Sequence, residues 1–341
     1  MDRVPVAVVG ASGYTGAELL RLLLSHPQVV IAGLYGRRAA GERLAAVFPQ
    51  FAGRLDLPIE AFSADEVARR AQVAFCALPH GESSPIVRDL YTRGLTVLDL
   101  SADLRLRDPA TYETWYGRAA DPLAQQAAYG LPELAGHPLR GQRLFAVPGC
   151  YPTAALLVLA PLVRAGLVER AGLIVDAKSG VSGAGRAPTA GTHFSEVGEG
   201  VHAYQVAAAH RHTPEIEQEL GASSVVFTPH LVPMSRGILA TCYAQPTDPE
   251  RPGAAYREAL AQFYRERPLV TVVDAPPDTA HVRGSNRAHV FAALDPRARR
   301  VIAMCALDNL GKGAAGQAVQ CMNLALGFPE TAGLDAVGMF P

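Results

Sequence analysis

The sequence lacks an excess of charge of either sign. Its 341 residues contain 31 Lys and Arg against 32 Asp and Glu, so the formal net charge is -1. A protein that recruits nucleic acid or an anionic membrane surface normally carries a basic field, and this chain has none overall. We therefore expect its partners to be small molecules or other protein subunits, with no nucleic acid and no membrane.

The features of a membrane or secreted protein are also missing. The longest apolar stretch, AALLVLAPLV after Thr153, is too short to span a bilayer and contains a proline. The chain enters the strand-like run VPVAVVG almost at once, without the basic flank and the small-residue cleavage site of a signal peptide. These absences predict a cytoplasmic protein.

Cysteine is sparse and shows no metal-binding pattern. The five cysteines are widely spaced, with no CxxC pair and no His-rich neighbourhood: Cys76, Cys150, Cys242, Cys305 and Cys321. This spacing argues against a structural metal site, and in a reducing compartment all five are expected to be thiols. We expect no metal, and the question becomes which thiol is reactive.

No internal repeat or low-complexity tract divides the chain, but its pattern changes near Pro148. Before that point short apolar runs alternate with helical patterns, which predicts an α/β fold with a Rossmann-type, doubly wound parallel sheet. Later runs are mainly strand-like and favour an α+β domain with a mixed or antiparallel sheet. We expect domains at 1–149 and 150–313, with a C-terminal helix at about 314–341 completing the first.

Three glycines mark a candidate dinucleotide site. Gly10, Gly13 and Gly16, in GASGYTG, follow an expected strand and open an expected helix, which is the context of a dinucleotide fingerprint. Glycines let the backbone approach a pyrophosphate, and the helix N-terminus supplies free N–H groups and a partial positive charge. The alternative is a tight strand-to-helix turn without a ligand.

The residues after the second expected strand indicate which dinucleotide is bound. An NAD-specific fold places an Asp or Glu there for the ribose hydroxyl, but no acidic residue occurs between Glu18 and Glu42. Arg37 and Arg38 follow the strand instead, and a guanidinium suits the 2′-phosphate of NADP. The alternative is a pair of solvated arginines in a surface loop.

Cys150 has the surroundings of a reactive thiol. It lies in VPGCYPTAALLVLAPL, after Gly149 and before an apolar helix that we expect from about Thr153. A helix N-terminus stabilises the thiolate over the thiol. Cys76, Cys242 and Cys305 lie inside apolar runs, where an inert buried thiol is expected. On this local pattern alone, an inert Cys150 stays possible.

The segment HRHTPEIEQEL, from His210 to Leu220, supplies candidate acid/base groups. Histidine is the side chain best suited to move protons at neutral pH. His210 and His212 lie on the same side of an extended segment, and Glu215 follows closely enough to orient one imidazole. A metal pair and a solvated polar loop are the alternatives, and no third ligand of comparable quality supports the metal.

A third group of polar residues follows the run LTVLDL. Ser101, Asp103 and Arg105, in SADLRLRDP, come at the carboxyl end of an expected strand, where ligands bind in doubly wound sheets. We expect Ser101 and Arg105 to contact substrate, with Arg105 as a clamp for a phosphate or a carboxylate. An ordinary loop with an internal Asp–Arg pair is the alternative.

Nine blocks along the chain resemble one known family, the N-acetyl-gamma-glutamyl-phosphate reductases, which are relatives of aspartate-semialdehyde dehydrogenase. In chain order the blocks are GASGYTGAELLRLL, ALPHGES, LSADLRL, YGLPEL, PGCYPTA, KSGVSGAGR, HRHTPEIEQEL, FTPHLVPMSRGILAT and LDNLGKGAAGQAVQ. The resemblance implies an NADPH-dependent, semialdehyde-forming reductase of arginine biosynthesis. Dimers or tetramers are usual in such families, so a homo-oligomer is expected.

The resemblance also implies roles for individual residues. Cys150 would be the nucleophile, His212 the acid/base and Glu215 its orienting partner, with His210 beside the substrate. The expected cofactor-binding residues are Gly10, Ser12, Gly13, Tyr14, Thr15, Gly16, Arg37, Arg38, Ser179, Gly180 and Asn309, with Gly311 and Lys312 near Asn309.

The chain departs from the family pattern at two positions. Val147 stands before PGC where the family usually has Asn, and Cys321 stands where Asn is common. The first departure bears on how the cysteine loop is held.

Three rival functions remain. A lysine-pathway homologue would reduce an aminoadipyl phosphate carried on a small acidic protein. A cysteine hydrolase or acyltransferase would use Cys150 and His212 without a dinucleotide. A non-catalytic NADP sensor would keep the fold but would have an unreactive Cys150.

Overall fold

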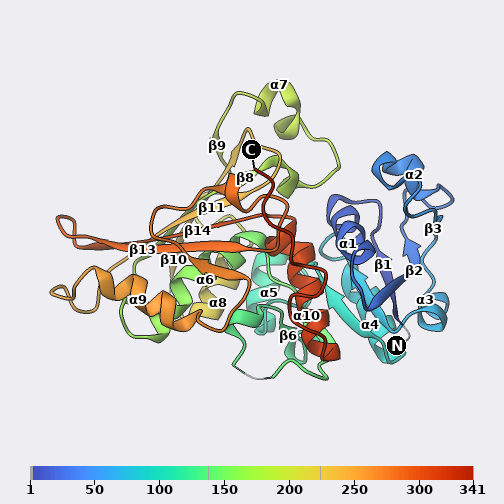
Figure 1. Cartoon of the computed structure of the whole chain (residues 1–341), viewed down its shortest axis with the longest axis horizontal. Coiled ribbons are helices and arrows are strands. Elements are labelled where there is room, and N and C mark those ends of the chain that lie inside the picture. The colour runs from blue at the N-terminus through green and yellow to red at the C-terminus, as the bar shows by residue number, and fades with distance from the viewer. Residues whose placement is uncertain (1–2, 137, 223, 341) are drawn as a thin grey trace. The chain divides into compact units, whose positions relative to one another are not determined.

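The structure is a computed structural model that describes residues 3–136, 138–222 and 224–340. The chain divides into two compact units (Figure 1). The first unit comprises Met1–Pro148 and Ala314–Asp335, and the second comprises Gly149–Gly313 and Ala336–Pro341.

The first unit is built on a seven-stranded sheet with the order β3-β2-β1-β4-β5-β7-β6. All of its neighbouring strands run parallel. The strands are β1 (Val4–Val9), β2 (Val29–Tyr35), β3 (Ile59–Glu60), β4 (Val73–Cys76), β5 (Thr96–Asp99), β6 (Ala128–Tyr129) and β7 (Leu144–Ala146). The chain leaves β1 toward β2 and later returns to β4 on the other side, so the sheet is doubly wound with its switch point between β1 and β4.

Helices cover both faces of this sheet. The helices of this unit are α1 (Tyr14–Leu24), α2 (Leu44–Val47), α3 (Ala64–Arg70), α4 (Ser83–Thr92), α5 (Pro109–Tyr116) and α10 (Gly316–Leu326), of which α1, α3, α4 and α10 pack on the strands. Helix α1 packs on α10, and α3 packs on α4. Because parallel strands need right-handed crossovers in opposite directions on the two sides of β1, these two helix pairs lie on opposite faces. Strands β4 and β5 are buried throughout, as expected for a covered parallel sheet.

The second unit has a seven-stranded sheet with the order β12-β13-β14-β11-β8-β10-β9. It is mixed, since β8 pairs parallel with β10 but antiparallel with β11. The strands are β8 (Leu173–Gly180), β9 (His202–Ala203), β10 (Val225–Val232), β11 (Ile238–Ala244), β12 (Val270–Val272), β13 (Ala288–Asp295) and β14 (Arg300–Leu307). Both sheets have the expected fold class: a Rossmann-type parallel sheet and an α+β unit with a mixed sheet.

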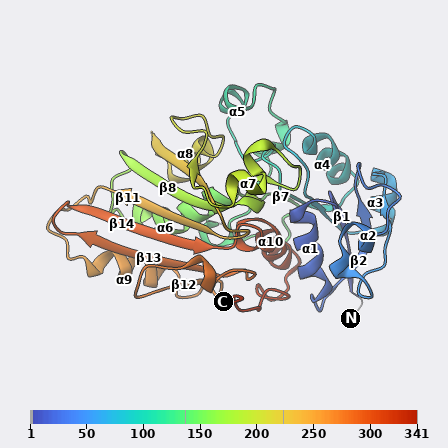
Figure 2. The ribbon, with the colours of Figure 1, turned by 90° about the horizontal axis from the view of Figure 1, so that it is seen from above.

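One face of the mixed sheet is covered by helices, as Figure 2 shows for α6 and α9. The helices of this unit are α6 (Cys150–Arg164), α7 (Phe194–Val197), α8 (Thr213–Leu220) and α9 (Ala254–Phe263). Helix α6 packs against β11 and β14 and also against α8 and α9. All of its residues from Tyr151 to Val163 are buried, so its uniformly apolar sequence reflects a place inside the unit.

The start of helix α6 and the unit to which the chain end belongs both differ from what the sequence predicts. Helix α6 begins at Cys150, three residues before the expected start, because Pro152 fits the first turn of a helix. The segment after α10 was expected to stay with the first unit as far as 341. Residues from Ala336 onward group with the second unit instead, since the Met339 N–H donates to the Arg283 carbonyl at 2.7 Å.

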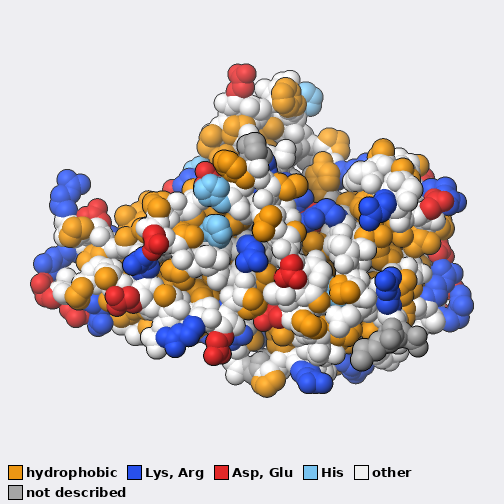
Figure 3. Space-filling model, viewed as in Figure 1, with side chains coloured by type: hydrophobic (Ala, Val, Ile, Leu, Met, Phe, Trp, Pro, Cys, Tyr) orange, Lys and Arg blue, Asp and Glu red, His pale blue; other side chains and the backbone are white. Residues whose placement is uncertain are grey.

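None of the helices among the described residues is long and apolar enough to cross a membrane. On the face of the molecule drawn in Figure 3, acidic and basic side chains are interspersed with hydrophobic ones.

Candidate active site

The glycine turn of the first unit is a close-packed backbone cradle. A Cβ atom at Gly10 would lie 2.2 Å from the Ala77 carbonyl oxygen, and one at Gly16 would lie 2.4 Å from the Gly10 carbonyl oxygen. Gly13, the N-cap of α1, has no side-chain cap, and its nearest neighbour to an added Cβ is 3.6 Å away. No side chain caps this helix N-terminus, so its backbone N–H groups can bind a pyrophosphate.

Arg37 and Arg38 follow β2, the neighbour of β1, in the same unit. Arg37 is 77% exposed and lies 3.4 Å from the Glu82 carboxylate. A guanidinium this exposed is accessible to a ligand, because a surface ion pair is worth little and exchanges readily. This position fits the expected 2′-phosphate contact.

Ser101 is part of a buried carboxylate network at the end of β5. Its hydroxyl donates to Asp99 at 2.8 Å, and the Ser83 hydroxyl donates to the same carboxylate at 2.7 Å. Burial raises the pKa of Asp99 to about 6, although these hydrogen bonds favour its charged form. Asp103 accepts the backbone N–H groups of Gly81 and Ser84 at 2.6 and 3.1 Å. The SADLRL segment thus fixes the loop that leads into α4.

Arg105 holds the segment that precedes the cysteine. It is 8% exposed, with Nε donating to the Val147 carbonyl at 2.8 Å and Nη2 donating to the Leu100 carbonyl at 2.9 Å. Val147 itself is fully buried, and its N–H donates to the Asp99 carbonyl at 2.8 Å. The loop with the unusual Val147 is therefore anchored through its main chain, and a side-chain amide at this position is not needed for these contacts.

Cys150 is the first residue of α6 and is partly exposed, with Gly149 as the N-cap. Its thiol is thus placed where the helix dipole favours the thiolate. The other four cysteines are fully buried. Burial raises the pKa of the Cys76, Cys242 and Cys305 thiols, which makes them inert. The structure accordingly singles out Cys150 among the five.

His212 and Glu215 enclose the residue before the cysteine. A Cβ atom at Gly149 would lie 2.4 Å from His212 Nε2, so the imidazole rests directly on Gly149. The Glu215 carboxylate, 1% exposed, accepts the Gly149 N–H at 2.9 Å. The sequence predicts that Glu215 orients an imidazole. In the structure its carboxylate binds the cysteine loop through the Gly149 N–H. The structure brings the three expected catalytic residues together.

His210 lies beside His212 and is uncharged at neutral pH. Its Nδ1 accepts the His212 N–H at 3.1 Å, so the ring proton resides on Nε2. Burial lowers the pKa of His210 to about 4, with Arg211 adding to the effect. The ring centroid is 4.7 Å from that of His212 and 5.8 Å from that of Tyr151. His210 thus positions His212 and does not carry a charge at neutral pH.

Two tyrosines that the sequence reasoning missed lie beside Cys150. Tyr204 donates to the Tyr151 hydroxyl at 3.2 Å, and Tyr151 donates to the His230 carbonyl at 3.1 Å. Burial raises the pKa of Tyr204 to about 12, and the charge of Cys150 adds to the rise. Both hydroxyls are protonated donors near the thiol. Tyr151 directly follows Cys150 in the chain, which is the one pattern that could have indicated it.

The expected cofactor residues of the second unit also converge. A Cβ atom at Gly183 would lie 3.0 Å from the Ser179 hydroxyl and 3.7 Å from the Asn309 amide nitrogen. Asn309 donates to the Ser182 hydroxyl at 2.9 Å and accepts the Gly237 N–H at 2.8 Å. Ser179, Gly180 and Asn309 therefore line one small region at the ends of β8 and β14. Lys312, in the π-helical turn Gly311–Ala315 that follows Asn309, is fully buried.

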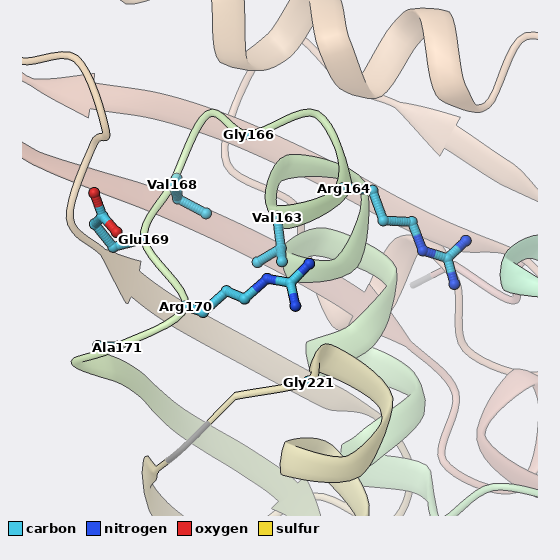
Figure 4. Close-up of a pocket in the computed structure, with 8 residues that line it drawn as sticks. All are labelled: Val163, Arg164, Gly166, Val168, Glu169, Arg170, Ala171 and Gly221. Atoms are coloured by element: carbon cyan, nitrogen blue, oxygen red, sulfur yellow. The ribbon is translucent and has the colours of Figure 1, made fainter.

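A pocket elsewhere in the second unit contains none of the expected site residues. It lies between the ends of α6 and α8 (Figure 4) and is lined by Val163, Arg164, Gly166, Val168, Glu169, Arg170, Ala171 and Gly221. Among the described residues, no three His, Cys, Asp or Glu side chains come together as a metal site would require.

Two family models match the chain. Residues 5–142 match the semialdehyde dehydrogenase, NAD binding domain, and residues 150–309 match the semialdehyde dehydrogenase, dimerisation domain. The two matches together cover most of the chain, and their boundary falls at the cysteine loop.

Relatives named N-acetyl-gamma-glutamyl-phosphate reductase align over the full length. The protein of Rhodospirillum rubrum is 49% identical over 355 residues, covering 100% of this chain and 99% of the relative. That of Desulforudis audaxviator is 48% identical over 347 residues, covering 99% of this chain and 100% of the relative.

Solved structures agree on the fold. Aspartate semialdehyde dehydrogenase II of Vibrio cholerae superimposes with a TM-score of 0.70 at 17% identity, covering 95% of this chain and 98% of that one. The Candida albicans enzyme, solved with NADP, has a TM-score of 0.66 at 15% identity, covering 95% and 98%. These likenesses show the fold alone. The family models and the full-length relatives show that this chain belongs to the N-acetyl-gamma-glutamyl-phosphate reductase family of the semialdehyde dehydrogenases.

Proposed function

We propose that the protein reduces N-acetyl-gamma-glutamyl phosphate to N-acetylglutamate 5-semialdehyde with release of phosphate, in arginine biosynthesis. The single observation that carries the proposal is Cys150 at the start of α6 with the imidazole of His212 against Gly149. The names of the full-length relatives favour this substrate over a carrier-bound aminoadipyl phosphate.

The first step is attack of the Cys150 thiolate on the acyl carbon. Phosphate leaves and a thioester forms, which divides one difficult reduction into two easier steps. The N-terminus of α6 favours the anionic sulfur, while Glu215 fixes the loop through the Gly149 N–H. We assign substrate contacts to Ser101, Arg105 and His210, with Arg105 near a phosphate or a carboxylate.

The second step requires NADPH. When bound, NADPH would supply the hydride that reduces the thioester carbonyl. The cradle at Gly10 and Gly16 and the exposed Arg37 fit such a dinucleotide, and we assign Ser12, Tyr14 and Thr15 to the same site. In the second unit we assign Ser179, Gly180 and Asn309 to it as well.

His212 would handle the proton of the reduced group. It donates a proton to the former carbonyl oxygen, which becomes negatively charged when the carbonyl is reduced. Return of that proton accompanies collapse to the aldehyde and release of the Cys150 thiolate, which restores the enzyme. Because His210 Nδ1 already accepts the His212 N–H, the backbone of His212 is fixed during these transfers.

Running the reaction backwards tests the proposal. The protein should reduce NADP with N-acetylglutamate semialdehyde only when phosphate is present, and Cys150→Ala should abolish this activity. Cys242→Ala is the matched control, since Cys242 is fully buried in β11 and should be dispensable. Phosphate-independent turnover, or full activity of Cys150→Ala, would contradict the proposal.

The cellular location and the oligomeric state of the enzyme belong to the same proposal. We place the enzyme in the cytoplasm, where its small-molecule substrate would be made. We also propose a homo-oligomer, a dimer or a tetramer, in keeping with the dimerisation-domain match over residues 150–309. Sedimentation of the purified chain would decide its oligomeric state.

A further inference from the structure

A buried ion pair in the second unit has no role in the steps above. Asp308 directly follows β14 and is fully buried, while Arg236 lies in the turn between β10 and β11. The Arg236 Nε lies 2.9 Å from one Asp308 carboxylate oxygen, and its Nη2 lies 3.0 Å from the other. The side chain of Arg236 is 20% exposed. This is the two-pronged geometry in which a guanidinium binds a carboxylate most strongly.

The carboxylate of Asp308 shapes the turn that follows it. It accepts the backbone N–H groups of Gly284 at 2.6 Å and of Leu310 and Gly311 at 2.9 Å each. With Arg236, all of these contacts are N–H donors, which is the set of partners that a carboxylate can accept. An ionised carboxylate is costly to bury without a compensating charge, and Arg236 supplies that charge.

The same turn rests against the proposed nucleophile. A Cβ atom at Gly313 would lie 2.9 Å from the Cys150 Cβ and 3.3 Å from the Asp308 carbonyl oxygen. The Gly313 N–H donates to that carbonyl at 2.9 Å. The main chain of Asp308 and the side chain of Cys150 therefore both contact Gly313.

A buried carboxylate acts on a neighbouring thiolate with less screening by solvent than an exposed one, and Asp308 is fully buried. A lone carboxylate at Asp308 would disfavour the thiolate of Cys150. Among the described residues, other titratable or charged groups lie around the cysteine. They are His212 and Glu215 at Gly149, His210 beside His212, the hydroxyls of Tyr151 and Tyr204, and the buried Lys312. They stay constant when only the ion pair is changed.

We propose that Arg236 is a positioning residue for the reaction. It neutralises the carboxylate that shapes the turn Asp308–Gly313, so that this turn can pack on Cys150 without opposing the thiolate. The inference rests on the proposed function only in taking Cys150 as the nucleophile.

The test is the pH dependence of Cys150 alkylation by iodoacetamide in the full chain, without substrate or cofactor. Arg236→Met leaves the carboxylate unneutralised, so the midpoint of the alkylation curve should move to higher pH. At pH 7 the reaction should slow by roughly three- to tenfold. Asp308→Asn keeps an oxygen for the backbone N–H groups but leaves Arg236 uncompensated. Its midpoint should move to lower pH, and the double variant should return near the wild-type value.

Opposite shifts separate this role from a merely structural one. A pair that only held the fold would change alkylation in the same direction in both single variants, and that result would overturn the proposal. Thermal melting of each variant shows whether it is folded. If Arg236→Met does not fold, Asp308→Asn and the double variant still test the proposal, because their alkylation midpoints are expected to differ from each other.

Arg299→Met is the matched control. Arg299 pairs with Glu250 at 3.0 Å just before β14, at the opposite end of the strand from Asp308, so its loss should leave the midpoint unchanged. Cys150→Ala identifies the alkylated residue. If wild-type Cys150 reacts no faster than the other cysteines, the covalent mechanism itself fails. If Cys150 is reactive but its midpoint is the same in all ion-pair variants, only the role of Arg236 fails.

Discussion

The glycine turn and the cysteine loop are both strand-to-helix turns, but they are held in different ways. The turn at Gly10–Gly16 is shaped by the absence of side chains, since a Cβ atom at Gly10 or Gly16 would collide with backbone oxygens. The loop at Cys150 is shaped by buried charged groups, because Glu215 accepts the Gly149 N–H and Asp308 shapes the turn that packs on Cys150. A binding cradle needs room, whereas a reactive group needs its charge set by neighbours.

The largest expected effect is on catalysis in the cysteine loop. His212→Ala removes the proposed proton donor, and turnover should fall by about 10²–10⁴-fold with little change in the melting temperature. Steady-state kinetics in the reverse direction measures this. Arg211→Ala, which changes the neighbouring side chain, is the control. A His212→Ala protein with wild-type kcat would show that the imidazole has no part in the chemistry.

The glycine turn should respond in the opposite way, with a loss of stability. Gly16→Ala places a methyl group 2.4 Å from the Gly10 carbonyl oxygen, and such overpacking should lower the free energy of unfolding by about 1–3 kcal/mol. Gly13→Ala is the matched control, since its methyl group would lie 3.6 Å from the nearest atom. Urea unfolding measures both. Equal stability of the two variants would contradict the close-packed turn.

Glu215→Ala combines the two kinds of effect. It leaves the buried Gly149 N–H without its acceptor, so stability should fall by at least about 1 kcal/mol, and kcat should fall because the loop of Cys150 is less well held. Glu215→Gln keeps an acceptor oxygen and should recover most of the lost stability. If both variants unfold at the wild-type urea concentration, the hydrogen bond to Gly149 does not hold the loop.

The smallest expected effect is the pH dependence that His210 contributes. Its pKa is about 4 in the folded chain, below the ordinary value of 6.5, because burial disfavours the charged ring. Between these two pH values the unfolded chain binds the extra proton, so stability falls as the pH drops from about 6.5 to about 4. His210→Phe should flatten this part of the stability curve. An unchanged slope in the variant would show that His210 is not buried as described.

Much of the fold could be predicted because its elements follow local rules. The runs VPVAVVG and AQVAFCALP became β1 and β4, since apolar segments between glycine and proline suit a buried parallel sheet. The glycine spacing and Cys150 before a proline-containing helix also depend on neighbours in sequence. The start of α6 was placed too late because Cys150 itself takes helical geometry.

Part of the candidate site depends on contacts between distant residues, and these could not be predicted. Asp308 and Arg236 are separated by 72 positions, and no local pattern distinguishes them from a solvated pair. Arg105 was expected beside a ligand, and the structure adds that it binds the Val147 and Leu100 carbonyls. Buried charges of this kind are recognised only when the fold brings their partners together.

In the proposed mechanism Cys150 carries the acyl group. Its most direct test is to mix the protein with N-acetylglutamate semialdehyde and NADP without phosphate, quench in acid and determine the mass of the peptide that contains Cys150. We expect a hydroxylamine-sensitive N-acetylglutamyl adduct on that cysteine and none in Cys150→Ala. An unmodified Cys150 in a protein that turns over when phosphate is added would contradict it.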